Sequence, residues 1–191
     1  AQLGTNSDTV LDIYYERADG SLSNIFVGID DFGSGIGEGE AASLNFPDLL
    51  TVQNKYQIKP PLPFVPGSEF AGIVQAVGDG VRHVRPGDAV ASIGAAGGFA
   101  THACVPASQL IPLPEGFDLD DGAAFAFTYG TSHHALMDRG ALRGGETVLV
   151  LGAAGGVGSA AVQIAKAAGA RVIAAVSSAD KAAFCTELGA D

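Results

Sequence analysis

GETVLVLGAAGGVGSAAVQIAK, residues 145–166, is the stretch that decides the fold. Its first part, residues 147–151, is a short apolar run rich in β-branched side chains, which is typical of a strand buried on both faces of a parallel sheet. Glycines and alanines follow at 152–156, and residues 159–166 have the composition of a helix. A strand, a glycine turn and a helix in this order predict a dinucleotide-binding turn.

The glycines of this turn have separate physical roles. Gly155 lets the backbone approach a pyrophosphate, whose space a Cβ would occupy, and Gly158 lets the helix pack close to the strand. N–H groups at the helix start and the positive end of the helix dipole favour an anion. The first glycine of the usual G-x-G-x-x-G pattern is an alanine here, so a glycine-rich loop without a ligand stays an alternative. The predicted cofactor-binding residues of the turn are Ala153, Ala154, Gly155, Gly156, Val157 and Gly158.

Composition narrows the classes of partner. The net charge of -11 comes from 10 basic and 21 acidic residues, which argues against nucleic acid or an anionic membrane as the main partner. No apolar run reaches the ~18 residues that a membrane span needs, and no signal-peptide pattern opens the chain. Cys104 and Cys185 form neither a metal-type spacing nor a disulfide framework. We therefore expect a cytoplasmic protein with a small-molecule partner.

The first 40 residues are atypical. Residues 11–16 and 24–30 have the pattern of two strands flanking a turn at 18–21. An acidic, glycine-rich stretch then leads to residue 40. Its carboxylates raise the possibility of calcium, but their spacing fits no EF-hand loop, so a solvated linker is favoured.

From residue 41 the pattern becomes regular. We expect a short helix at 48–53 and a proline-stiffened segment at 59–67. One strand is expected at 70–77, a second where the turn at 84–90 enters a strand, and a third that ends at Val105. Short strands at ~10-residue spacing, with turn signals between them, predict a small β-barrel. Helices at 118–128 and 131–139 precede the glycine-turn strand, and a second strand at 171–176 and a helix at 179–188 follow it. The chain thus reads as a β-barrel followed by alternating strands and helices.

Residues 41–191, about four fifths of the chain, resemble a known family. The stretch from Gly145 to Lys166 matches, at every defined position, the signature of the zinc-independent quinone oxidoreductase branch of the medium-chain dehydrogenase/reductases. Further segments similar to that branch are Asn45-x-x-Asp48, Tyr56, Pro66-Gly67-Ser68-Glu69 and Thr128-Tyr129-Gly130-Thr131.

The resemblance implies a fold and a domain organisation. The fold class is α/β plus β: a GroES-like β-barrel catalytic domain, followed by the first half of a Rossmann doubly wound parallel sheet. The expected divisions are an atypical segment at 1–40, a catalytic domain at 41–120 and an NADP-binding domain at 121–191. The family also implies a homodimer for the full-length protein.

The sequence departs from the family at both ends. The strand that normally precedes the alanines at 41–42 is missing, and residues 1–38 resemble no family N-terminus, which favours a foreign, rearranged or misread segment over a new functional module. The chain ends at Asp191, before the remaining strands of the family's sheet, so it is expected to be a fragment with poor activity alone.

Zinc-binding relatives hold their catalytic zinc with a cysteine and a His-Glu pair. Here the cysteine position falls within residues 43–45, and the histidine position is Ser68, beside Glu69. Zinc needs three or four well-placed ligands, which this sequence does not offer. We expect no metal site. Without a Lewis acid, hydride addition to a quinone or an activated C=C bond is the easier chemistry, because the resulting enolate needs only hydrogen-bond donors and a proton.

The resemblance also assigns roles to individual side chains. Asn45 and Thr131 are expected to hold the nicotinamide half of the cofactor, and Tyr56 and Asp48 to orient or protonate the substrate at the cleft mouth. The catalytic candidates are therefore Asn45, Asp48 and Tyr56. Plainer alternatives are a helix cap for Asn45 or Asp48 and a packed ring for Tyr56.

The end of the second parallel strand predicts the cofactor. An NAD enzyme usually carries an acid there, but this strand runs into Ser177 and Ser178, with Lys181 nearby. Two hydroxyls and an ammonium suit a 2′-phosphate, which favours NADPH, although Asp180 opposes it and Lys181 could be a solvated surface charge. The leading hypothesis is an NADPH-dependent reductase of quinones or enones and enals. The alternatives are an enoyl-thioester reductase of the acryloyl-CoA type and a non-catalytic NADPH-binding relative.

Overall fold

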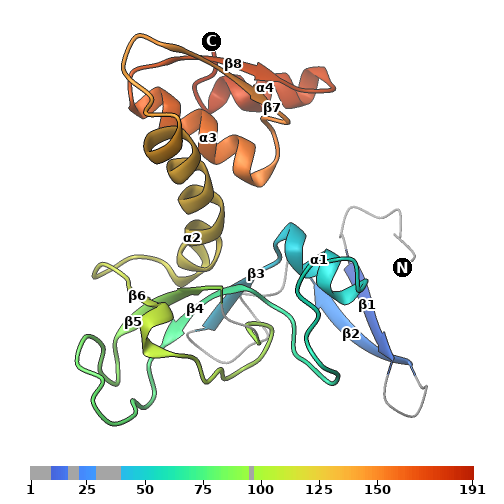
Figure 1. Ribbon diagram of the computed structural model, residues 1–191. Helices are drawn as coiled ribbons and strands as arrows, with labels where there is room; N and C mark the ends of the chain where they lie inside the picture. Colours follow the sequence, from blue (N-terminus) through green and yellow to red (C-terminus); the bar gives the residue numbers. More distant parts are fainter. Residues whose placement is uncertain (1–9, 17–21, 29–39, 95–96) are drawn as a thin grey trace. The chain divides into compact units, whose positions relative to one another are not determined.

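The computed structural model describes residues 10–16, 22–28, 40–94 and 97–191, and the chain divides into two compact units, 1–124 and 125–191. The first unit begins with an antiparallel hairpin of β1 (Val10–Glu16) and β2 (Leu22–Gly28), in which Val10 lies opposite Gly28 (Figure 1). The two strands predicted near the N-terminus are confirmed. The turn between them and the acidic stretch at 29–39 lie outside the described residues.

A four-stranded antiparallel sheet, in the order β3-β4-β5-β6, forms the body of the first unit. Small residues let a helix approach it closely, since Ala71 and Ala91 on the sheet pack with Ala123. A Cβ on Gly122 would lie 2.8 Å from Leu113 Cδ1, so only glycine fits there without a shift. The strands are β3 (Glu40–Ser43), β4 (Glu69–Ile73), β5 (Ala89–Ile93) and β6 (Leu110–Pro112).

One expectation for this sheet is wrong. Residues 97–105 form no strand, and the chain instead reaches β6 through a 3₁₀ turn at Ala107–Gln109. Strand propensity depends on a neighbour to pair with, and residues 101–104 are exposed. Strand β3 contains the alanines at 41–42, and its backbone pairs with β4 from Glu40 opposite Gly72 to Ser43 opposite Glu69. The missing strand was expected before these alanines, and residues 29–39 lie outside the described part of the chain.

The helices are close to those predicted, with one merger. Helix α1 (Phe46–Val52) begins two residues earlier than expected, with Asn45 as its N-cap. One helix, α2 (Leu119–His133), covers all but the first residue of the first predicted helix and the start of the second, and a π-helical turn at His134–Arg139 continues it. Gly130 lies inside this helix. A single glycine lowers helix stability by only about 1 kcal/mol relative to alanine, which is not enough to break the helix.

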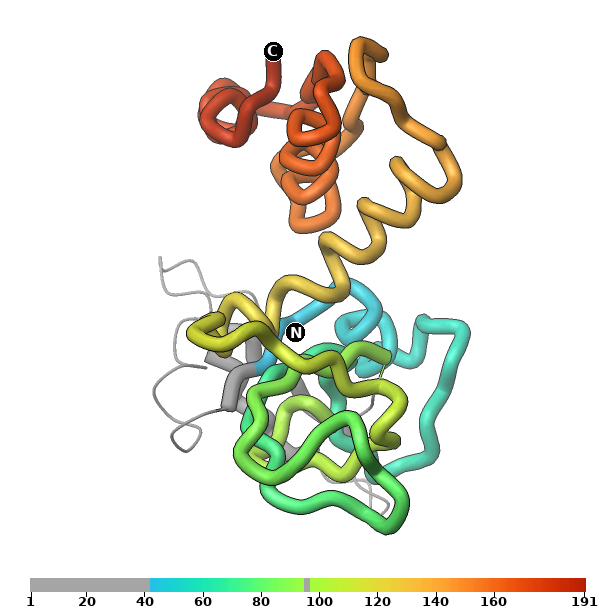
Figure 2. The backbone as a smooth tube through the Cα atoms, turned by 90° about the vertical axis from the view of Figure 1, so that its left-hand side faces the viewer, coloured from blue at the N-terminus to red at the C-terminus, as the bar shows by residue number. Residues whose placement is uncertain are grey.

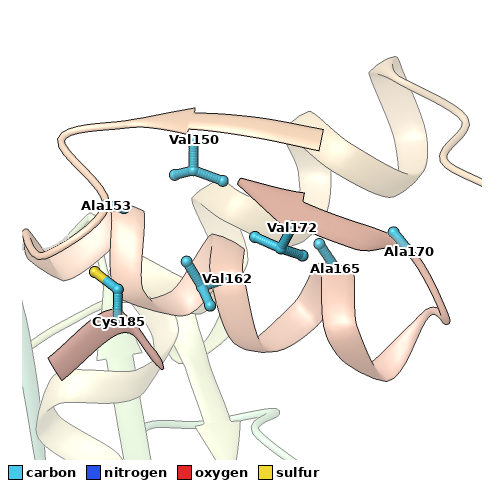
Figure 3. Close-up of a cluster of buried hydrophobic side chains, with 7 residues drawn as sticks. All are labelled: Val150, Ala153, Val162, Ala165, Ala170, Val172 and Cys185. Atoms are coloured by element: carbon cyan, nitrogen blue, oxygen red, sulfur yellow. The ribbon is translucent and has the colours of Figure 1, made fainter. Parts of the chain in front are cut away.

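The second unit contains β7 (Thr147–Leu151), α3 (Gly156–Ala167), β8 (Arg171–Ala175) and α4 (Ala179–Glu187), a chain path drawn in orange and red in Figure 2. The two strands pair in parallel, with Leu149 opposite Ile173. Val150 and Val172 point from one sheet face towards Val162 of α3 (Figure 3). The cluster is completed by Ala153, Ala165, Ala170 and Cys185.

The other face of this two-stranded sheet is open. Leu149 and Leu151 are 60% and 75% exposed, whereas Val150 between them is 8% exposed. The sequence predicted a strand buried on both faces, and β7 is buried on one. The alternation follows from the strand geometry, because successive side chains point to opposite faces and α3 covers only one of them.

Candidate cofactor and substrate sites

The glycine turn sits at the carboxyl end of β7, before α3. Gly152 turns the chain with a positive φ of 65°, and its N–H donates to Ala175 O at 3.0 Å. The Gly155 N–H donates to Gly152 O at 3.0 Å, and Gly155 is the N-cap of α3. A Cβ on Gly158 would lie 2.4 Å from Gly152 O and 2.8 Å from Ala153 Cα. Residue 158 must therefore be glycine, because the start of α3 packs closely against the turn that follows β7.

The departure from G-x-G-x-x-G has a structural reason. The positive φ of the turn belongs to Gly152, and Ala153 is not among the residues with positive φ. Ala153 is fully buried in the core of this unit, where its methyl group packs, so it can serve a cofactor only through its backbone. Ala154 is half-buried, and residues 155–157 are exposed at the start of α3. The N–H groups of a first helical turn lack acceptors within the helix, which makes this surface suited to an anion.

Two side chains of helix α2 contact the start of α3, next to the glycine turn. Ser132 is 1% exposed, and its Oγ donates to Val157 O at 2.8 Å. Thr128 lies one helical turn before Ser132. A Cβ added to Gly156 would lie 3.2 Å from Cγ2 of Thr128. Ser132 was not among the residues predicted for the site. The signal was its spacing of four residues from Thr128, which puts both side chains on one face of the helix.

The three residues predicted at the end of β8 come together. Lys181 Nζ donates to Ser177 Oγ at 3.3 Å, and Ser178 is the N-cap of α4, with its Oγ accepting from the Lys181 N–H at 3.4 Å. All three residues are exposed, as is Asp180. The carboxyl ends of neighbouring parallel strands lie at one edge of a sheet, so this group and the glycine turn share an edge.

In the first unit, Asn45 joins two buried carboxylates. Its backbone N–H donates to Asp48 Oδ2 at 2.9 Å, and its side-chain Nδ2 donates to Glu69 Oε2 at 2.9 Å. Asn45 is 7% exposed, Asp48 5% and Glu69 0%. The helix-capping alternative for Asn45 and Asp48 is therefore present in the structure, together with a link to β4. Glu69 was quoted in the sequence motif but given no role.

Burial governs the titration of Asp48. Desolvation raises the pKa of its carboxyl group above the ordinary value, while the Asn45 N–H and the nearby polar groups of Ser68 and Gly67 pull the pKa back down. Ser68 Oγ is buried near this carboxylate, without a well-aligned hydrogen bond to any described residue. A carboxyl group that gains a proton more readily than usual suits a donor role.

The remaining predicted residues are placed more simply. Tyr56 is half-buried just after α1, and its N–H donates to Leu50 O at 3.2 Å. Thr131 is exposed on α2, in the second unit. Their predicted contacts with substrate and nicotinamide stay predictions.

Two features are absent from the described part of the chain. None of its helices is both long and apolar enough to cross a membrane. Within the same residues, no three or more His, Cys, Asp or Glu side chains gather in a way that could hold a metal ion.

Comparison with known proteins agrees with this architecture. The family described as Alcohol dehydrogenase GroES-like domain matches residues 38–115, and the family described as Zinc-binding dehydrogenase matches residues 156–191. A Synaptic vesicle membrane protein VAT-1 homolog of Rattus norvegicus is 43% identical over 126 residues, which are 66% of this chain and 31% of the relative. The Quinone oxidoreductase of Rattus norvegicus is 42% identical over 134 residues, 70% of this chain and 41% of the relative.

A solved structure is similar over nearly the whole chain. The quinone oxidoreductase from Thermus thermophilus, determined also in complex with NADPH, is 35% identical with a TM-score of 0.71, covering 95% of this chain and 58% of that one. The chain is thus a medium-chain dehydrogenase/reductase, with a GroES-like domain followed by part of a Rossmann-type domain. Within that superfamily it belongs with the quinone oxidoreductases, which confirms the predicted resemblance and fold class.

Proposed function

We propose that the protein is an NADPH-dependent, zinc-free oxidoreductase that transfers hydride to a quinone or to the activated C=C bond of an enone or enal. One observation carries the proposal: the glycine turn, closed by the contact of Gly158 with Gly152, shares a sheet edge with the Lys181–Ser177 pair. The similarity to a quinone oxidoreductase solved with NADPH supports the same cofactor.

The residues of the second unit fit this cofactor. The first turn of α3, which begins at Gly156, offers backbone N–H donors to a pyrophosphate, and the exposed Gly155 and Gly156 place no side chain in its way. Ser177 and Lys181 offer a hydroxyl and an ammonium to a 2′-phosphate, and Ser178 holds the start of α4 in place. When bound, the nicotinamide supplies the hydride.

The first unit supplies the polar groups for the substrate half. Asn45 is held in position by the Asp48 and Glu69 carboxylates, so its amide is fixed before any ligand arrives. Asp48, with its raised pKa, is the candidate that protonates the enolate left by hydride addition, and Tyr56 orients the acceptor. The zinc-free assignment rests on residue chemistry, because a serine stands where zinc-binding relatives carry a histidine ligand.

Oxidation of NADPH, followed by absorbance, tests the proposal. We expect turnover with 9,10-phenanthrenequinone or 1,4-benzoquinone, and slower turnover with crotonyl-CoA. Preferred use of crotonyl-CoA would instead indicate an enoyl-thioester reductase, and NADPH binding without turnover of any acceptor would indicate a non-catalytic relative. Tighter binding of NADH than of NADPH would overturn the cofactor assignment.

Three further expectations belong to this proposal. The full-length protein forms a homodimer in the cytoplasm, which size-exclusion chromatography with light scattering and localisation of a tagged protein would test. The 191-residue chain alone turns over poorly, because Leu149 and Leu151 leave one face of the nucleotide-binding sheet open. Full activity of that chain would contradict this expectation.

A further inference from the structure

The segment between α1 and β4 contains a loop that is held at both ends. Residues 55–65, called here the 55–65 loop, contain neither helix nor strand. At one end, the Tyr56 N–H donates to Leu50 O at 3.2 Å, and just past the other end Pro66 O accepts from the Phe99 N–H at 3.0 Å. Three prolines between these ends restrict the backbone. The loop lies at the outer edge of the first unit in Figure 2, where it is drawn in turquoise.

The side chains of the 55–65 loop divide into a half-buried set and an exposed set. Tyr56, Pro60 and Phe64, spaced four residues apart, are half-buried. Ile58 and Leu62 are 66% and 59% exposed. Large apolar side chains that are exposed together beside polar residues are typical of an interaction surface. The loop therefore keeps its aromatic rings against the protein and presents aliphatic side chains to a partner.

The charge of the 55–65 loop is opposite to that of the whole chain. Lys55 and Lys59 are exposed, and neither forms an ion pair with another described residue. Lys55 Nζ donates to the side chain of Gln53 at 3.1 Å, and this neutral group leaves the positive charge uncompensated. Residues 49–68 contain no aspartate or glutamate, although the chain has a net charge of -11. The loop is thus a basic and apolar surface on an acidic protein.

We propose that the 55–65 loop docks the protein on a lipid bilayer that carries anionic headgroups. Ile58 and Leu62 enter the apolar side of the interface, and Lys55 and Lys59 contact the phosphates and carboxylates of the headgroups. Lysine suits this position, because its stem lies along apolar surface while its ammonium stays among polar groups. The net charge argues against a membrane contact over the whole surface, but the attraction of each lysine falls off within a Debye length and so acts locally.

A second copy of the chain suits this loop less well than a bilayer does. A symmetric contact would bring two copies of the same basic loop together, and their lysines would repel each other. An anionic bilayer complements the charge and also accepts the aliphatic side chains. The inference does not rest on the proposed function, because it uses neither the glycine turn nor the residues bonded to Asn45.

Co-sedimentation of the full-length protein with sucrose-loaded vesicles measures the docking. One set of vesicles is pure phosphatidylcholine, and in the other a quarter of the lipid is phosphatidylserine. We expect the wild type to bind the phosphatidylserine vesicles at least about tenfold more tightly, and added salt to remove this preference. The double change Ile58→Ser and Leu62→Ser should weaken binding to both sets about tenfold, because burial of apolar surface does not depend on headgroup charge.

Matched variants separate the loop from the rest of the surface. Lys59→Gln should weaken binding to the phosphatidylserine vesicles about fivefold and leave binding to phosphatidylcholine unchanged. Arg82→Gln removes one positive charge at another exposed residue of the first unit, and Ile111→Ser removes an aliphatic side chain that is 44% exposed. Both controls should bind the vesicles as the wild type does.

Three results would overturn the docking role. The first is a wild-type protein that binds phosphatidylserine vesicles no better than phosphatidylcholine vesicles. The second is an I58S/L62S variant that binds as the wild type does, or an R82Q variant that is weakened as much as K59Q. The third is a change of oligomeric state in I58S/L62S, measured by light scattering, which would assign the loop to a contact between copies.

Discussion

The glycine turn and the Asn45 cluster serve the same proposed reaction, but they are built in different ways. The turn is local and made of backbone, with Gly152, Gly155 and Gly158 contacting one another across a few residues. The Asn45 cluster is made of side chains, and its bond to Glu69 spans 24 residues of sequence. A local backbone motif is fixed by spacing alone. A side-chain cluster depends on how strands and helices pack, so its geometry emerges only in the folded chain.

The sharpest test of the backbone half of this comparison is Gly158→Ala. The added Cβ would lie 2.4 Å from Gly152 O, so the turn or the start of α3 must move. We expect a loss of about 1–3 kcal/mol in unfolding free energy and, since the phosphate-binding donors move with the turn, at least about tenfold weaker NADPH binding. Urea unfolding and calorimetry measure the two effects.

Gly130→Ala is the matched control for that change. A Cβ on Gly130 meets no atom within 4 Å, and the residue lies inside α2. The variant should be as stable as the wild type or more so, with unchanged NADPH binding. If G158A binds NADPH as tightly as G130A does, the close contact with Gly152 O does not shape the cofactor site.

Lys181→Ala addresses the side chains at the same sheet edge. Its ammonium contacts Ser177 Oγ at 3.3 Å and is exposed, so its contribution to a 2′-phosphate is that of one solvent-screened, charged hydrogen bond. We expect the ratio of NADPH to NADH affinity to fall about fivefold, with NADH binding unchanged. Lys55→Ala, which removes an exposed lysine bonded to Gln53, should leave the ratio unaltered. An unchanged ratio in K181A would make Lys181 a simple surface charge.

Ser132→Ala tests whether the turn depends on its support from α2. The Oγ donates to Val157 O at 2.8 Å, and this oxygen can still accept the helical bond of α3 after the change. The expected loss is therefore modest, about 1 kcal/mol in unfolding free energy and about twofold in NADPH affinity. Ser108→Ala, at an exposed position, is the control. Loss of stability with fully retained affinity would show that Ser132 supports the fold alone.

The sequence predicted the local motifs well and the contacts between residues distant in the sequence poorly. Residues 147–151 were predicted as a strand from their pattern, and β7 has those bounds. Ser177 and Lys181 were predicted to act together, and they do contact each other. Glu69 received no role, because it bonds to Asn45, which lies 24 residues away in the sequence. The spacing of Ser132 from Thr128 places both on one helix face, but it does not identify Val157, 25 residues away, as the partner of Ser132. The strand expected before Val105 failed for the same reason, since a strand depends on a neighbour.

The pH dependence of the unfolding free energy tests the Asn45 cluster through Asp48, and its expected effect is the smallest of those predicted. Burial raises the pKa of Asp48 in the folded protein above its unfolded value, so between these two values the folded state holds more protons. The slope of the unfolding free energy against pH is proportional to the number of protons bound by the unfolded state minus the number bound by the folded state. This difference is negative here, so stability falls as the pH rises through this window. Asp48→Asn removes the titrating group but keeps an oxygen that can accept the Asn45 N–H. Urea unfolding from pH 4 to pH 8 should therefore show a less negative slope for D48N than for the wild type.

Asp120→Asn, the same change in the exposed first turn of α2, separates a local effect of Asp48 from a general effect of net charge. Both variants remove one carboxylate, but only D48N removes one whose charged form is disfavoured by burial. D120N should therefore retain the wild-type slope. If both variants alter the slope equally, long-range charge explains the pH dependence, and the desolvated environment of Asp48 does not. If only D48N alters it, the same burial that raises the Asp48 pKa also keeps this carboxyl group ready to donate a proton near Asn45.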